Sequence, residues 1–187
     1  MRERVEETAS ELRELAAQAE ERFAGLSAQQ LNWKPSAGRW SVAQCLDHLI
    51  TTHSLYFPLF KKLEKGDLSP SWWERFSPLS GFFGRFLIKS LRPDNRRKLK
   101  APAKARPSAS EIDGDIVERF RRHQAELAEH VEKTPSGVDP AQTIITSPLL
   151  GLVTYSLDDT FTILVVHTQR HLAQAQRVVE AEAFPVW

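Results

Sequence analysis

Residues 156–178, SLDDTFTILVVHTQRHLAQAQRV, decide the fold class of this chain. Their apolar residues follow the three- and four-residue spacing of an amphipathic helix. Ser156, followed three residues later by Asp159, has the spacing of a capping box at a helix N-terminus. The stretch therefore predicts a long helix that begins near Ser156 and carries His167 and His171 one turn apart.

Three upstream segments show the same helical periodicity. Residues 2–24 carry an apolar stripe, and so does a segment that is expected to begin near Ser108 or Ser110. Strict alternation of apolar and polar residues, which is typical of half-buried strands, is almost absent from the chain. The sequence therefore predicts an all-α protein.

The remaining helical segment contains a predicted interruption. Ser41 and Gln44 have capping-box spacing, so a helix is expected to begin there and to run to Gly66. Pro58 lies inside this pattern and removes one backbone hydrogen bond, because proline has no N–H group. We expect a kink or a break near residues 54–58.

Length and composition indicate one soluble globular domain. A chain of 187 residues is long enough for one core and short for two, so residues 1–187 are expected to form a single domain. The N-terminus is charged from Arg2 onward, and no stretch approaches the roughly 20 apolar residues that span a membrane. We expect a cytoplasmic protein. Cys45, the only cysteine, is expected to pack in the core.

Residues 67–110 are expected to form a long irregular excursion between the second and third long helices. They hold five of the eleven prolines, six tryptophan and phenylalanine residues, and a run of nine basic residues at 85–106, where the one acid is Asp94. The aromatic residues are expected to cover the core, since six of them in water would form a large exposed patch.

Two other interpretations of this segment remain open. Residues 70–106 could instead serve a binding or association module that contacts an anionic membrane, a partner helix or a second copy in a homodimer. Nucleic acid is a less favoured partner, because the net charge of the whole chain is only +1 and no groove-reading helix is recognisable. Such binding would depend on Arg96, Arg97 and Lys98.

The histidine pattern predicts a metal site. On a helix, residues four apart lie on one face, so His167 and His171 can converge on one ion. A third ligand must come from another helix, and His48 is the best candidate, with His53 in reserve. His123 and His130 are expected to be packed or partly exposed side chains; they and Asp47, Arg170 and Gln174 receive no role in the site.

Three neutral imidazoles leave coordination positions open, which is the layout of a catalytic zinc site. The same nitrogens also suit nickel or another first-row divalent ion. A metal-activated thiol is one expected nucleophile and metal-activated water, as in a hydrolase, is another. The chain contains no H-E-x-x-H motif, which weakens the prediction of a zincin-like protease.

Two stretches together resemble the DinB-like superfamily. LNWKPSAGRWSVAQCLDHL at 31–49 resembles that family's entrance to its second helix, and SPLLGLVTYSLDDTFTILVVHTQRHLAQAQRV at 147–178 resembles its final helix. The resemblance implies a four-helix bundle whose divalent metal is held by His48, His167 and His171. The superfamily includes thiol-dependent transferases and isomerases that use low-molecular-weight thiols such as bacillithiol, mycothiol or glutathione. Of these, we expect a thiol-dependent S-transferase that acts on a small electrophile.

Overall fold

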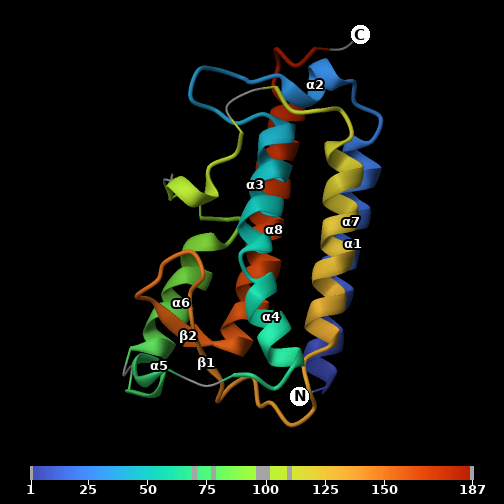
Figure 1. Ribbon diagram of the computed structural model, residues 1–187. Helices are drawn as coiled ribbons and strands as arrows, with labels where there is room; N and C mark the ends of the chain where they lie inside the picture. Colours follow the sequence, from blue (N-terminus) through green and yellow to red (C-terminus); the bar gives the residue numbers. More distant parts are fainter. Residues whose placement is uncertain (1, 69–70, 77–78, 96–101, 109–110, 186–187) are drawn as a thin grey trace.

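Four helical segments lie side by side along the length of the molecule (Figure 1). In the computed structural model, which describes residues 2–68, 71–76, 79–95, 102–108 and 111–185, they are α1, α3 continued by α4, α7 and α8. Their bounds are Arg2–Phe23 for α1, Val42–Ser54 for α3, Phe57–Glu64 for α4, Ile116–Glu132 for α7 and Leu157–Val179 for α8. Helix α1 packs on α7 and α8, and α3 packs on α8 and α7.

Local sequence signals explain where α3, α4 and α8 begin and end. The capping boxes at Ser41 and Ser156 are both complete, with the side-chain oxygen accepting from the backbone N–H three residues on. The expected break at Pro58 is confirmed, since α3 ends at Ser54 and α4 starts at Phe57 with the proline in its first turn.

The core lies between the four segments. Its largest fully buried side chains include Phe23, Phe60, Phe120 and Phe161. Cys45 is buried in the same cluster, as expected, and burial raises the pKa of its thiol. A neutral thiol in an apolar core packs as a small hydrophobic side chain and does not act as a nucleophile.

Helix α7 begins later than the sequence pattern predicts. The expected start was Ser108 or Ser110, whereas the helix begins at Ile116. The later start is explained by two hydrogen bonds between Ile112 and the side chain of Asn32. Asn32 is the last residue of the short helix α2, Ala28–Asn32. The Asn32 Oδ1 atom accepts from the backbone N–H of Ile112 at 2.9 Å, and its amide nitrogen donates to the Ile112 carbonyl at 2.8 Å. These bonds hold Ile112 in a non-helical connection.

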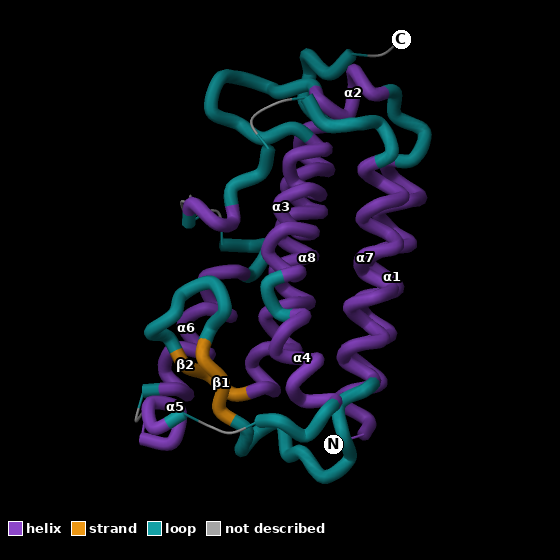
Figure 2. The backbone as a smooth tube through the Cα atoms, in the orientation of Figure 1, coloured by secondary structure: helices purple, strands orange, loops and turns teal. Residues whose placement is uncertain are grey.

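The segment at 67–110 is more regular than expected. It contains α5 (Trp72–Phe76), α6 (Ser80–Leu91) and a short 3₁₀ helix, η1 (Ala103–Ala105). An antiparallel hairpin of β1 (Ile144–Thr146) and β2 (Thr154–Ser156) pairs Ile145 with Tyr155. It was not anticipated, because three-residue strands are too short to show alternation. Helices α5 and α6 and the hairpin form a side lobe next to α8 (Figure 2).

Among the residues that the structure describes, no helix is both long enough and apolar enough to cross a membrane. The basic residues Arg96, Arg97, Lys98 and Lys100 of the segment fall outside the described ranges.

Candidate metal centre

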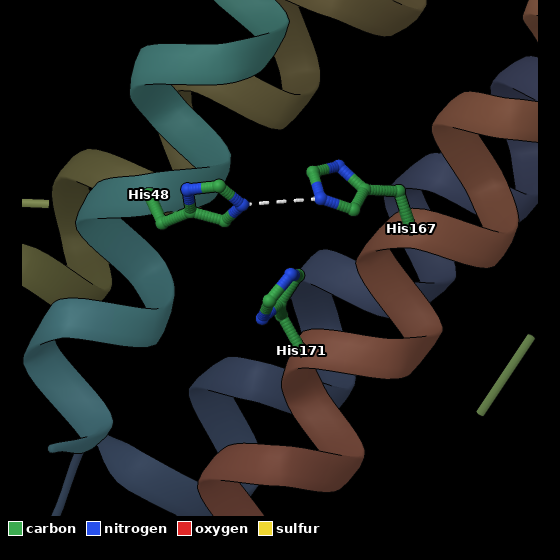
Figure 3. Close-up of side chains that lie close together, drawn as sticks. All are labelled: His48, His167 and His171. Atoms are coloured by element: carbon green, nitrogen blue, oxygen red, sulfur yellow. Dashed lines mark hydrogen bonds between the residues drawn. The ribbon is translucent and has the colours of Figure 1, made fainter. Parts of the chain in front are cut away.

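Three histidines from two helices meet between α3 and α8 (Figure 3). His48 comes from α3, and His167 and His171 come from successive turns of α8. One ring nitrogen of each lies within 4.8 Å of the other two, and the Nε2 atoms of His48 and His167 are 3.2 Å apart. Two nitrogens that bind one tetrahedral zinc ion at its usual bond length lie about 3.3 Å apart. The side chains expected from the sequence are therefore brought together at a spacing that suits a metal ion.

A loop carbonyl fixes the orientation of His48. The Nδ1 atom of His48 is in hydrogen-bond contact with the backbone carbonyl of Ala105. A carbonyl can only accept, so Nδ1 carries the proton and donates it. The lone pair of His48 is then on Nε2, which faces His167. The tautomer that a metal ligand needs is thus set by the backbone.

The loop that supplies this carbonyl is held by the helix that carries His48. The backbone N–H of Ser108 donates to Asp47 Oδ2 at 2.9 Å, and the side-chain nitrogen of Gln44 donates to the Ser108 carbonyl at 2.8 Å. Asp47, which had no assigned role from the sequence, therefore positions the loop. Its engaged carboxylate oxygen points to Ser108 and not to the histidine cluster.

His167 has a second histidine behind it. The Nδ1 atom of His167 lies 3.2 Å from Nε2 of His53, and Nδ1 of His53 lies 3.3 Å from the side-chain amide of Gln124. If His167 offers Nε2 to an ion, its Nδ1–H donates to His53. His53 then carries its proton on Nδ1 and can donate to the Gln124 oxygen once the amide is turned. His53, expected only as a reserve ligand, is thus placed to support His167.

Trp40 forms one wall of the cluster. Its indole ring stacks on His171 with ring centres 5.5 Å apart and planes 23° apart, and it also lies 4.8 Å from the ring of His48. The Nδ1 atom of His171 is buried and has no hydrogen-bond partner among the described residues. A buried ring nitrogen without a partner is costly in an apolar environment.

Burial keeps these imidazoles neutral. It lowers the pKa of His48 and, together with repulsion from the neighbouring histidines, lowers the pKa of His171 further. The pKa of His167 falls to about 3 through burial and the proximity of His48, although the residue keeps some exposed surface. Neutral imidazole is the form that binds a metal, so the donor set fits a divalent cation at neutral pH.

The other histidines and polar residues named from the sequence lie elsewhere. His123 Nε2 is 2.9 Å from Ser54 Oγ, and the ring of His130 packs at a tilt against Phe57 with ring centres 4.9 Å apart, so both are packed side chains of α7. Arg170 donates to the carbonyls of Ser90 and Arg92, at 3.3 and 3.1 Å, and to that of Asn95. It therefore ties the end of α6 to α8. No role emerges for Gln174.

Sequence reasoning missed four contributors to this centre: Trp40, Ala105, Gln124 and the actual contact of His53. In the sequence, Trp40 lies in a connector that precedes a helix, and Gln124 lies within an ordinary helical stripe. The role of Ala105 had no signal in the sequence, because its main-chain oxygen makes the contact. Only His53 carried a detectable signal, as a histidine five residues after His48 on the same helix.

Comparison with protein families supports the resemblance seen in the two motifs. Residues 11–175 match the family model of the DinB superfamily. Comparisons with curated proteins and with solved structures give no match. The matched region includes all of α3 and the part of α8 that carries the histidine cluster. On this match over most of its length, the chain belongs to the DinB superfamily.

Proposed function

We propose that this protein is a metal-dependent enzyme whose divalent ion, zinc or nickel, is held by His48, His167 and His171. The observation that carries the proposal is the convergence of one nitrogen from each ring within 4.8 Å, in a place where burial keeps the rings neutral. The contacts of His48 with Ala105 and of His167 with His53 support it, because they orient two of the three ligands.

The proposed reaction joins a low-molecular-weight thiol to a small electrophile: the thiol loses its proton to solvent, its sulfur forms a bond to the electrophilic carbon, and the bond from that carbon to the leaving group, such as halide, breaks. A divalent ion with three histidine ligands and open positions would lower the pKa of a bound thiol toward neutrality. The protein's part is to hold its three imidazoles neutral and correctly oriented, with Trp40 closing one side. The remaining exposure of His167 leaves an approach for a small molecule.

Two cationic side chains near the histidine cluster favour a substrate thiol that carries carboxylates, such as a peptide-like thiol. Lys104 and Arg106 are exposed and flank Ala105, whose carbonyl contacts His48. Guanidinium and ammonium groups at this position can bind the carboxylates of a substrate whose sulfur approaches the histidines.

A metal-dependent hydrolase is the alternative reaction. It would use activated water and profit from a nearby carboxylate as general base. Within the described residues, the cluster around His48 contains no aspartate or glutamate, and Asp47 is engaged by Ser108. This composition favours the thiol reaction, because a thiol needs no separate base once its pKa is lowered.

The same proposal covers the architecture. We assign α1, α3 with α4, α7 and α8 to the four-helix bundle that the family resemblance implies, with residues 67–110 as an excursion from it within a single domain. The mutual packing of these helices supports this assignment.

Elemental analysis of the purified protein tests the metal site. We expect about one divalent ion per chain in the wild type and loss of that ion in His48→Ala, His167→Ala and His171→Ala. His130→Ala is the matched control, because it removes a buried histidine outside the cluster and should retain the metal. Metal-free wild type that takes up neither zinc nor nickel on titration would overturn the proposal, provided that circular dichroism shows a helical fold.

A second assay separates the two reactions. The metal-loaded protein is offered a panel of low-molecular-weight thiols with a chromogenic haloarene, and separately a chromogenic ester. Thiol-dependent turnover that disappears in His48→Ala supports the transferase. Ester cleavage that does not depend on added thiol would show that the protein is a hydrolase and not a transferase.

A further inference from the structure

The exposed apolar surface of this protein is concentrated on the side lobe. Of the side chains that the structure describes, every large apolar one that is exposed lies there: Trp72, Trp73, Leu79, Phe82, Phe86 and Leu152. Trp72 is 73% exposed, and Phe82 and Phe86 are each 57% exposed. The expectation that the aromatic residues of 67–110 cover the core is therefore wrong for Trp72, Trp73, Phe82 and Phe86. We call the six side chains the apolar patch; such a patch on a folded protein indicates an interaction site.

The apolar patch rests on an ordered support. The indole N–H of Trp73 donates to the Leu152 carbonyl at 3.2 Å, which connects α5 to the hairpin loop. The Glu74 carboxylate accepts from the backbone N–H of Thr146 at 2.8 Å and fixes α5 to β1. On α6, the rings of Phe82 and Phe86 lie parallel with centres 6.2 Å apart. The patch therefore spans three elements that are bonded or packed to one another.

A row of cations runs beside these phenylalanines. Arg85, Lys89 and Arg92 are all exposed and follow one another along α6 and its C-cap at spacings of four and three residues. The only acid between residues 85 and 106 is Asp94, and Glu74 is occupied by its hydrogen bonds to the hairpin. One strip of α6 is thus aromatic and the adjoining strip is basic, which is the pattern of a helix that lies in a membrane interface.

We propose that the side lobe docks on an anionic lipid surface. The rings of Trp72, Phe82 and Phe86 enter the headgroup region, and Arg85, Lys89 and Arg92 contact lipid phosphates. The positive charge along α6 favours an anionic lipid surface, rather than a second copy of the chain, as the partner of the apolar patch. A second copy would add its own Arg85, Lys89 and Arg92 to the contact and double its positive charge, whereas an anionic surface neutralises these cations. This surface activity is separate from the proposed metal chemistry.

Vesicle flotation tests the proposal with the full-length protein. We expect the wild type to float with vesicles of phosphatidylcholine mixed with phosphatidylglycerol, and to bind pure phosphatidylcholine much more weakly. Lys89→Gln and Arg85→Gln should each reduce partitioning about fivefold. The double variant Phe82→Ser with Phe86→Ser should reduce it by at least about tenfold, because both rings lose their apolar contact with lipid.

Arg22→Gln is the matched charge control, because Arg22 is exposed on α1, away from the side lobe (Figure 1). It should change partitioning by less than about twofold, since its charge does not face the lipid. Metal content and circular dichroism should stay at wild-type values in every variant. Absence of flotation, or equal flotation with neutral and anionic vesicles, would overturn the proposal. Light scattering that shows a dimer dissociated by the double phenylalanine variant would assign the patch to a second copy instead.

Discussion

His53 is a histidine that the sequence places near His48, but its contact with His167 appears only in the structure. It sits behind His167 and before Gln124 in a line of three polar side chains. We predict that His53→Ala weakens metal binding by about 10- to 100-fold while the three ligands remain. Competition with a chromophoric chelator measures this, and His123→Ala provides a control at another buried histidine. An affinity for His53→Ala equal to that of the control would show that His167 needs no support.

His123 offers a test of stability against pH. Burial lowers its pKa from 6.5 to about 4. Between these two pH values the imidazole of His123 is protonated in the unfolded chain and neutral in the folded chain. The free energy of unfolding therefore falls as the pH drops through this window. The contribution of His123 approaches roughly 3 kcal/mol at the acid end. Urea unfolding of metal-free protein at several pH values should show a shallower pH dependence in His123→Gln, and an unchanged slope would contradict the burial argument.

The ligand candidates could be predicted from single residues, but their supports could not. Their helical spacing indicates His167 and His171 as ligand candidates, and its position on a second amphipathic helix indicates His48. Trp40 and Gln124 act through contacts between segments far apart in the chain, such as the stacking of Trp40 on His171. A periodic pattern reports which face of a helix is buried and not which neighbour it meets.

At the scale of elements, the close approach of α6 to α8 depends on Gly84. A methyl group on Gly84 would overlap the carboxylate of Asp159, which accepts from the Ser156 N–H in the capping box of α8. We predict that Gly84→Ala lowers the free energy of unfolding by about 1–3 kcal/mol, through overpacking or loss of the cap. Urea unfolding provides the measurement.

Gly81→Ala is the matched control on the same helix. The added methyl group would meet only the end of the Arg85 side chain, at 3.6 Å. Alanine also favours the helical state over glycine, so this variant should be neutral or slightly stabilising. If Gly84→Ala behaved in the same way, the packing of α6 on α8 would be looser than the structure indicates.

Element boundaries show what local signals can and cannot decide. The capping boxes at Ser41 and Ser156 and the break at Pro58 follow from interactions within a few residues, and all three were predictable. The start of α7 was not, because Asn32, which comes 80 residues before Ile112, competes for the backbone there. The hairpin escaped prediction because its strands are three residues long.

At the scale of the whole molecule, the described part of the segment at 67–110 contacts both helices that carry the candidate metal centre. The carbonyl of Ala105 contacts His48, and Arg170, next to His171 in the chain, holds carbonyls at the end of α6. A helix order and a family match describe the long helices, but neither predicts that the segment at 67–110 supplies a support for the candidate centre. That relation exists only once the chain has folded back on α3 and α8.

The contact between Ala105 and His48 has a consequence for how the site can change in evolution or by engineering. A main-chain oxygen is the same in every amino acid, so position 105 is restricted only by the size of the buried space around it. Glycine or serine at this position should therefore keep the contact, whereas a large side chain would overpack the buried space. Deletion of one residue between 102 and 108 would leave every ligand in place and shift the carbonyl off the imidazole. At position 105, therefore, the support of His48 is sensitive to the length of the chain and not to the identity of a small side chain.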